Sequence, residues 1–348
     1  MTTTRVRGAT GTTITIFDVA RHAGVSITTV SHVFSGKRPV KEETRRRVMD
    51  AADSLRYRPQ RTAIALARGR TMNLAVYAPT GDSDPVLNPF FSLLLPVMSA
   101  AAVAMGYTFV LFTSDRMTEN LADALLAGRT VDGVILIDPQ RGDPFVDRLA
   151  AADVPFVSLG RILDGPDTPR ADIDQRALCR EVLDHLAGEG YERPALFTGG
   201  SGTSYVFDLQ KTFRRLAPGQ PVVQVDDRSD RAAYAAAQWL LKAEPRPDAI
   251  FCANDQLAVV VLRVAAQLGL EVPRDLAVVG VGDSLARHAD PPLTSVRKHP
   301  EQLGELLVSK LDRRLGGGDD EPRVSIVAAD LVVRQSSVRY DRSAGAAS

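Results

Sequence analysis

The sequence of 348 residues is too long for one ordinary hydrophobic core and fits two or three compact units. Its composition, 45% hydrophobic and 24% charged, excludes a disordered chain, and no apolar run approaches the roughly eighteen residues of a membrane helix, so we expect a cytoplasmic protein without a membrane segment. The net charge is zero, but residues 1–71 hold fourteen basic side chains and five acidic ones, while the other 277 residues hold 28 basic and 37 acidic ones. This asymmetry predicts a nucleic-acid contact surface at the N-terminal end.

A helix-turn-helix is predicted directly after a polar, disordered arm at 1–14. Thr15 offers a hydroxyl cap and Asp18 stands three residues later, a variant of the capping box that starts a helix. That helix ends at Gly24, where a left-handed backbone is expected, and Ser26 can cap the next helix. Two short helices joined by a Gly-Val-Ser turn are typical of a helix-turn-helix.

The second helix has the side chains of a recognition helix. Ile27, Thr28 and His32 lie on its outward face, where a methyl group can meet thymine methyls and a hydroxyl or imidazole can hydrogen-bond base edges. The helix N-termini near Thr15 and Ser26 can also hold phosphates. This part of the chain therefore predicts binding to double-stranded DNA through the major groove.

A third helix, from about residue 41 or 42 to Leu55, closes the small core with Val48, Ala51, Ala52 and Leu55 at helical spacing. Its basic run at 45–47 is partly a solvated face and partly a source of phosphate contacts, which fix register without selecting sequence. The residues expected to contact DNA in these helices are Thr15, Ser26, Ile27, Thr28, Thr29, His32 and Arg45.

From Met72 onward, short apolar strands alternate with amphipathic helices. Strand and helix in turn predict parallel sheets with right-handed crossovers, and the pattern runs twice, which predicts two similar lobes. Ligands in such lobes lie beyond the carboxyl ends of the strands. The predicted strands are 74–78, 109–112, 133–137, 156–159, 195–198, 249–252 and 277–281.

Nothing in the sequence predicts an enzyme, a cofactor or a metal site. The chain lacks Gly-x-Ser-x-Gly, His-Glu-x-x-His and Walker motifs, and its glycine-rich stretch at 198–202 fits neither a phosphate-binding loop nor a dinucleotide fingerprint. Cys179 and Cys252 are far apart in apolar stretches, so both are expected to be small buried hydrophobes.

Sequence segments spread over about residues 15–338 resemble, in the same order along the chain, those of the lactose/galactose repressor family. The N-terminal segments are most similar to the purine repressors of that family. The matching N-terminal stretches are Thr15-Ile16-Phe17-Asp18-Val19-Ala20, Ala23-Gly24-Val25-Ser26, Thr28-Thr29-Val30-Ser31-His32-Val33 and Tyr57-Arg58-Pro59. Later ones include Asn88-Pro89-Phe90-Phe91, Ala253-Asn254-Asp255 and Pro291-Pro292-Leu293-Thr294-Ser295-Val296.

The resemblance implies an all-α helix-turn-helix DNA-binding head and an α/β two-lobed core like that of periplasmic binding proteins. The implied parts are a helix-turn-helix domain at 15–59, a hinge helix at 60–71, a core for effector binding and dimerisation at 72–340 and a disordered tail at 341–348. Within the core, the N-lobe takes about 72–172 and 301–327, and the C-lobe takes about 173–300 and 328–340.

The segment at 60–71 resembles the family's hinge helix and its Gly-Arg-Thr ending. In the family, a hinge leucine from each subunit wedges into the central base step of the minor groove, and by position that residue is Leu66. The alternative is that Ala63, Leu66 and Ala67 only pack a linker helix onto the body. Ala67 also stands where the family often has a basic residue, so one phosphate contact is expected to be missing.

The resemblance implies an effector in a cleft between the lobes, but the sequence departs from the family there. Leu209 stands at the position of an arginine that clamps the effector, Gly282 replaces an aspartate, and Arg228 stands where relatives have a stacking aromatic ring. An effector that is anionic or smaller than a hexose is therefore expected, because a guanidinium recognises carboxylates and phosphates. For Asn254 the alternative role is to cap the helix that follows. The candidate effector-binding residues are Phe90, Asp115, Asp174, Leu209, Arg228, Asn254 and Asp283.

Together these features predict a homodimeric, sequence-specific transcriptional regulator that binds a pseudo-palindromic operator under the control of a small molecule. Repression is favoured by the resemblance alone. One alternative is an operator-binding regulator whose small-molecule control is lost or changed. A stand-alone small-molecule-binding protein would need an export signal and no basic N-terminal end, and the sequence meets neither condition.

Overall fold

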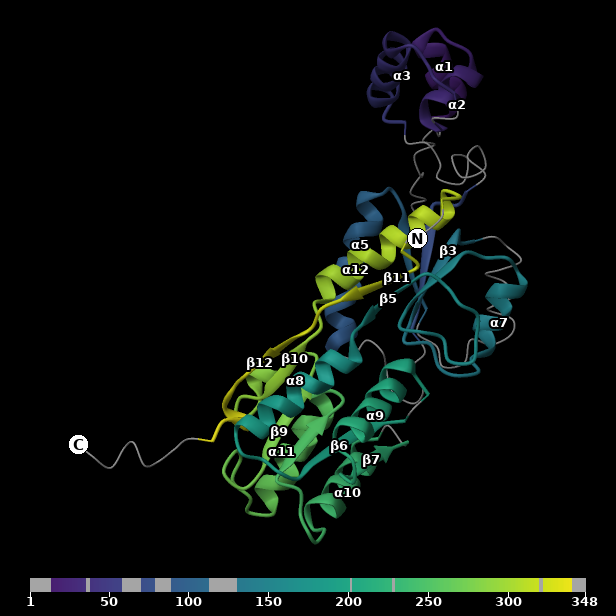
Figure 1. The fold of residues 1–348 in the computed structure, drawn as a ribbon. Helices are drawn as coiled ribbons and strands as arrows, with labels where there is room; N and C mark the ends of the chain where they lie inside the picture. The colour runs from purple at the N-terminus through teal and green to yellow at the C-terminus, as the bar shows by residue number, and fades with distance from the viewer. Residues whose placement is uncertain are drawn as a thin grey trace, which may run out of the picture. The chain divides into compact units, whose positions relative to one another are not determined.

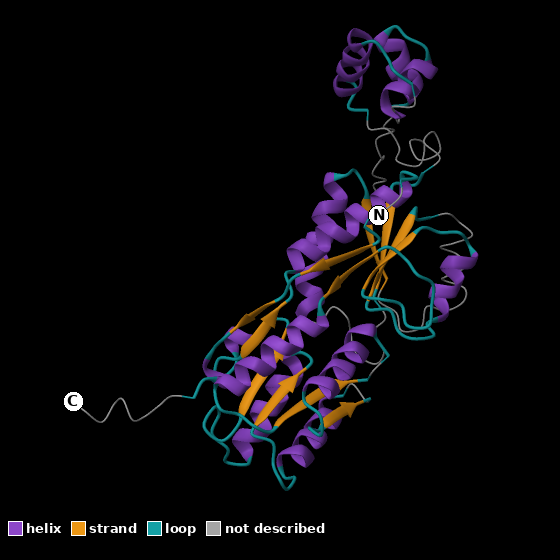
Figure 2. Cartoon of the chain, viewed as in Figure 1, coloured by secondary structure: helices purple, strands orange, loops and turns teal. Residues whose placement is uncertain are grey.

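The chain consists of two units, a short helical one and a long α/β one. In the computed structural model the first unit takes Met1–Met72 and the second takes Asn73–Ser348. Figure 1 colours the chain by residue number, and Figure 2 separates its helices from its strands. The residues that the structure describes are 14–35, 38–57, 70–78, 89–112, 130–200, 202–226, 229–318 and 322–339.

Three helices, α1 (Ile16–Ala23), α2 (Ile27–Ser35) and α3 (Glu42–Ser54), form the described part of the first unit. The predicted start of α1 is confirmed, because the Asp18 carboxylate accepts hydrogen bonds from the backbone N–H of Thr15 at 3.0 Å and from its hydroxyl at 2.7 Å. The predicted turn is confirmed as well, because Gly24 follows α1 with a φ of 63°. This left-handed conformation is costly for other residues, so the turn into α2 depends on glycine.

The three helices enclose a small core of short apolar side chains. Val19, Val30 and Val48, one from each helix, are completely buried. Phe34 and Tyr57 lie at the edge of this core with their ring centres 5.9 Å apart. The side chains around it are mostly valine and alanine, which lets short helices pack closely without long side chains between them.

Two sheets of six strands each form the centre of the second unit in its described part, as the alternation of strands and helices predicts. The first has the order β11 (Val324–Val327), β5 (Arg170–Ile173), β4 (Phe156–Leu159), β3 (Gly133–Ile137), β1 (Asn73–Tyr77) and β2 (Thr108–Phe112). The second has the order β12 (Asp330–Val332), β10 (Thr294–Arg297), β9 (Ala277–Val281), β8 (Ala249–Cys252), β6 (Pro194–Gly199) and β7 (Val222–Val225). Neighbouring strands run parallel except β10 and β12, which are antiparallel.

Five strands fall outside those predicted from the sequence: β5, β7, β10, β11 and β12. Each has only three or four residues, and several mix charged with apolar side chains, as in Arg170-Ala171-Asp172-Ile173. All five lie at a sheet edge or next to one. Four of them, all except β10, are less buried than the central parallel strands, and β10 is buried but begins with two hydroxyl side chains, Thr294 and Ser295. They therefore lack the continuous apolar run that identifies a central strand in a sequence.

The first sheet with α5 (Pro89–Ala104), α7 (Pro144–Ala151) and α12 (Pro300–Leu315) is called the N-lobe below. The second sheet with α8 (Gln175–Gly188), α9 (Ser204–Leu216), α10 (Asp230–Leu241) and α11 (Asp255–Gln267) is called the C-lobe. Helices α5 and α12 lie side by side (Figure 1). Gly304 permits this contact, because a Cβ atom there would lie only 2.9 Å from Cγ1 of Val97.

Three connections carry the chain between the lobes, after β5, after β10 and after β11. Strands β5 and β11 lead out of the N-lobe, and β10 leads from the C-lobe into α12. Because the strands of each sheet other than β12 run parallel, their carboxyl ends all point toward the junction of the lobes. This is the place where folds of this class bind ligands.

Candidate nucleic-acid interface and ligand cleft

The N-terminus of α2 is capped by a side chain and presents its next residues to solvent. The Ser26 hydroxyl oxygen accepts a hydrogen bond from the backbone N–H of Thr29 at 3.1 Å and lies 2.9 Å from the Thr29 hydroxyl. Ile27 is 41% exposed, and Thr28 is exposed beside it. A rigid helix end with a short methyl-bearing and a hydroxyl-bearing side chain can approach base edges closely. His32, one turn further on, is half-buried, so only part of its ring faces solvent.

The arginines of α3 have different roles, which the sequence alone did not separate. Arg47 donates from Nη2 to the carbonyl oxygen of Ala23 at 2.6 Å, and the carbonyl of Gly24 lies 3.4 Å from the same atom. It thereby satisfies the C-terminus of α1. Arg45 is exposed and makes only a loose ion pair with Glu42 at 3.9 Å. Of the two, Arg45 is the arginine that no backbone carbonyl of the described residues holds in place, so its guanidinium can turn to a phosphate.

Phe17 is a surface residue that the sequence analysis did not single out. It lies in the first turn of α1 and is 60% exposed. An amphipathic helix commonly uses phenylalanine for its buried face, so the residue type by itself suggested core. Its position is the signal, because Val19, Ala20 and Ala23 define the buried face and Phe17 lies off it.

Three predicted site residues, Leu66, Asp115 and Arg228, lie outside the described residues. The hinge wedge at Leu66 and the anion contact at Arg228 therefore stay predictions.

At the junction of the lobes, loops of the N-lobe contact the N-terminal half of α9. Nη2 of Arg161 lies 3.0 Å from each carboxylate oxygen of Asp208. The backbone N–H of Arg161 donates to the hydroxyl of Ser204 at 2.9 Å, and that of Arg141 donates to the carbonyl of Gly202 at 2.7 Å. The two lobes are thus joined by hydrogen bonds and an ion pair in addition to the three chain connections.

A buried lysine at the same junction was also missed. Lys298 follows β10, is 9% exposed, and its Nζ lies 3.7 Å from the ring centre of Phe90 in α5 and 4.9 Å from that of Tyr205 in α9. Burial lowers the pKa of Lys298, and the carboxylates of Asp138 and Asp255 offset part of this effect. Of the predicted effector residues, Phe90 is the one that the structure brings to this lysine.

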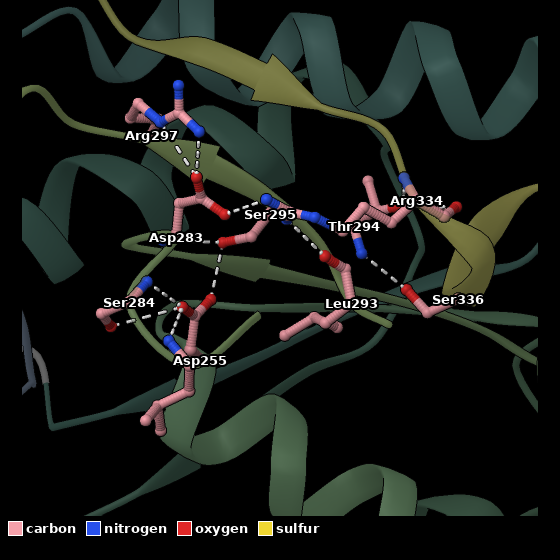
Figure 3. A network of polar contacts seen from close by, with 10 residues as sticks. Asp255, Asp283, Ser284, Leu293, Thr294, Ser295, Arg297, Arg334 and Ser336 are labelled. Carbon is pink, nitrogen blue, oxygen red and sulfur yellow. Dashed lines mark hydrogen bonds and ion pairs between the residues drawn. The ribbon is translucent and has the colours of Figure 1, made fainter. Parts of the chain in front are cut away.

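Asp283 belongs to a network of charged and polar groups inside the C-lobe (Figure 3). One carboxylate oxygen pairs with Nη2 of Arg297 at 2.5 Å and the other with Nη2 of Arg334 at 2.6 Å. The backbone N–H of Asp283 donates to the Ser295 hydroxyl, which donates in turn to Oδ1 of Asp255 at 2.6 Å. The Asp283 side chain is only 4% exposed, so the network ties β10 to the segments before and after it.

Three further candidates are occupied in structural roles. Asn254 caps α11, accepting the backbone N–H of Leu257 at 2.8 Å, which is the alternative that the sequence left open. Asp174 caps α8 in the same way and lines a surface groove of about 400 Å³ that also includes Asp208. Leu209 is completely buried and offers no surface to a ligand.

The described residues contain no group of three or more histidine, cysteine, aspartate or glutamate side chains placed to hold a metal ion. Cys179 and Cys252 are both buried, as predicted. Each helix within the described ranges is too short or too polar to cross a bilayer.

Two protein-family profiles match the chain. The profile described as bacterial regulatory proteins, lacI family, matches residues 15–60, and the profile described as periplasmic binding protein-like domain matches residues 183–337. The HTH-type transcriptional regulator CelR of Thermobifida fusca is 34% identical and the alignment covers 91% of this chain and 96% of CelR. The HTH-type transcriptional repressor PurR of Photobacterium profundum is 31% identical over 92% of this chain and 98% of PurR.

Solved structures resemble the chain over nearly its whole length. A complex of the transcriptional regulator CelR with cellobiose has a TM-score of 0.70 and 32% identity, and covers 93% of this chain and 99% of its own. The lac repressor dimer bound to operator and the anti-inducer ONPF has a TM-score of 0.76 and 25% identity, and covers 94% of this chain and 100% of its own.

Proposed function

Because the chain belongs to the lacI family of bacterial regulatory proteins and is a DNA-binding transcriptional regulator, we propose that it represses genes as a homodimer on a pseudo-palindromic operator, under control of a small molecule in the interlobe cleft. A regulator of this kind acts where the chromosome is, which places it in the cytoplasm. It has no role as an enzyme in this scheme, and it needs no cofactor.

The capped and exposed N-terminus of α2 is the observation that carries the DNA-binding part of the proposal. Ser26 holds the first turn, while Ile27 and Thr28 face solvent. Two copies of this helix, one from each subunit, would enter successive major grooves, and base edges would be distinguished by these short side chains. The lac repressor, similar in fold and sequence, is a dimer on operator DNA in its solved complex, which supports a homodimer here.

The junction of the lobes supports the effector part of the proposal. CelR holds cellobiose in its solved complex, and the present chain shares its two-lobed fold. A ligand that prefers one angle between the lobes would change operator affinity, and operator would change ligand affinity by the same factor. An alternative is a regulator whose lobes respond to no ligand, which the direct Arg161–Asp208 pair favours because it joins the lobes without one.

The test is selection of bound duplexes from a random DNA pool by the purified full-length protein, followed by sequencing. Enrichment of a pseudo-palindrome with a central pyrimidine-purine step is the expected result, because such steps are easily kinked. The same selection with Thr28→Ala should change the enriched bases at one position in each half-site. No enriched sequence at low salt, with or without cell metabolites, would reject the proposal.

A further inference from the structure

Lys298 is a cation that the structure leaves without a hydrogen-bond acceptor in a buried place. Its ammonium group carries three N–H donors. Among the described residues, none accepts a hydrogen bond from Nζ and no carboxylate forms an ion pair with it; the contacts it makes are with the faces of Phe90 and Tyr205. The residue is 9% exposed, and its three donors are available to an acceptor that enters between the lobes.

The Tyr205 hydroxyl and the Asp255 carboxylate already form hydrogen bonds with other groups. The Tyr205 hydroxyl donates to the carbonyl oxygen of Ala253 at 2.7 Å. The carboxylate of Asp255 accepts from the Ser295 hydroxyl at 2.6 Å and from the backbone N–H of Ser284 at 2.8 Å. These hydrogen bonds hold both side chains in place, and in the part of the chain that the structure describes neither forms a hydrogen bond with Lys298.

The two aromatic faces bear on what can bind here. A neutral sugar commonly stacks its apolar face on an aromatic ring, but the ammonium of Lys298 already occupies one face of Phe90 and of Tyr205. The site therefore offers a stacking platform only after the lysine moves away. It offers a desolvated cation without any rearrangement.

Lys298 contacts both lobes, so a ligand bound to it can affect both. Phe90 belongs to the N-lobe and Tyr205 to the C-lobe, and Lys298 itself lies in the connection between β10 and α12. Nε2 of the next residue, His299, lies 2.7 Å from a carboxylate oxygen of Asp330, the first residue of β12, where the connection after β11 ends. A ligand on Lys298 would thus act on two of the three interlobe connections.

We infer that Lys298 recognises a carboxylate or phosphate group of the effector in the interlobe cleft. This inference rests on the proposed function and names the chemical class of its ligand. An oxyanion would accept charge-assisted hydrogen bonds from the N–H groups of the ammonium. A sugar acid and a sugar phosphate both supply such a group, and the experiment separates them.

The test is titration calorimetry of the full-length protein with sodium gluconate, glucose 6-phosphate and inorganic phosphate as anions, and with glucose and cellobiose as neutral probes. At least one of the two sugar anions should bind saturably, and both neutral sugars should bind at least about tenfold more weakly. Binding of gluconate alone would identify a carboxylate site, and binding of glucose 6-phosphate alone a phosphate site.

The variant Lys298→Met should weaken the anion that binds by about 10- to 100-fold, the range expected when a charged hydrogen-bond donor is lost. Methionine keeps most of the side-chain volume, so the variant is expected to fold. The thermal midpoint of the variant shows whether it does. The exposed Lys242→Met, also in the C-lobe, is the control for loss of one positive charge and should bind the anion as the wild type does.

Three results would overturn the inference: no saturable binding of any anion at millimolar concentration, neutral sugars binding as tightly as the anions, or an unchanged anion affinity in Lys298→Met. Operator binding of the same preparations, measured without ligand, distinguishes this failure from failure of the proposed function. A protein that selects a palindrome but ignores the anions remains a regulator with another ligand or none.

Discussion

Arg161 pairs with both carboxylate oxygens of Asp208, each at 3.0 Å, and so links a loop of the N-lobe to α9 of the C-lobe. Both side chains remain partly exposed, at 40% and 34%. Solvent screens such a pair, which limits its contribution to the free energy of unfolding to about 0–1 kcal/mol. Its geometry acts on the angle between the lobes more than on their stability.

Asp208→Asn should therefore change the thermal midpoint little while making the lobes easier to separate. Small-angle scattering of the wild type and the variant without ligand would show a larger radius of gyration in the variant. The exposed Asp184→Asn on α8 is the control for removal of one carboxylate. A large loss of stability in Asp208→Asn would mean that the pair has a buried structural role after all.

Asp283→Asn, in contrast to Asp208→Asn, should strongly reduce the stability of the fold. Asp283 is 4% exposed and faces Arg297 and Arg334, so the variant removes the anion of the largely buried Arg334, 13% exposed, and of the more exposed Arg297. We expect a loss of about 3–5 kcal/mol in the free energy of unfolding, measured by urea denaturation. A loss below about 1 kcal/mol, the usual effect of a surface change, would contradict the structural role.

Thr28→Ala should weaken binding to the selected operator by about 1–3 kcal/mol and leave binding to random DNA unchanged. The reason is that Thr28 is exposed next to the capped end of α2 and supports no contact inside the unit that the structure describes. Fluorescence anisotropy on both DNAs measures the two affinities. Met49→Ala, exposed on α3, is the control. Equal losses on operator and random DNA would reject base reading by Thr28.

Arg45→Ala should affect DNA binding, and Arg47→Ala should affect the stability of the first unit. Removing Arg45 should lower the salt dependence of operator binding by about one unit of slope without changing stability. Removing Arg47 leaves the carbonyl of Ala23 without its 2.6 Å donor and should cost about 1–2 kcal/mol of stability. Thermal denaturation and salt titrations of both variants decide the assignment, and reversed effects would refute it.

Asp18 should make the first unit sensitive to acid. Hydrogen bonds from the hydroxyl and then the backbone N–H of Thr15 hold the pKa of Asp18 below its usual value of 3.8. A carboxyl group whose pKa is lower in the folded state stabilises the fold above its unfolded pKa, and this contribution disappears as pH falls through the folded value. Asp18→Asn should be less stable than wild type at neutral pH, and the difference should vanish in strong acid. A difference of the same size at neutral pH and in strong acid would contradict this role of the carboxylate.

The elements of both units were largely predictable from the sequence because their signals are local. The hydroxyl of Thr15, the turn at Gly24 and the hydroxyl of Ser26 lie within a few residues of the helix ends that they determine. The seven predicted strands are apolar runs, and in a parallel sheet covered on both faces such a run must be buried wherever it is placed. The five strands that escaped prediction are short, and their pairing at or next to a sheet edge depends on neighbours far along the chain.

Local sequence therefore determined the helix-turn-helix, the alternation of strands and helices, and the residue types on the exposed end of α2. The tertiary structure decided which side chains are free to act. It enclosed Asp283 between two arginines and buried Leu209, whereas the caps made by Asn254 and Asp174 are again local contacts. It also brought Phe90, Tyr205 and Lys298 together. Lys298 is separated along the chain from Phe90 by 208 positions and from Tyr205 by 93, so these contacts depend on how the two sheets and their connections are placed, which no local pattern encodes.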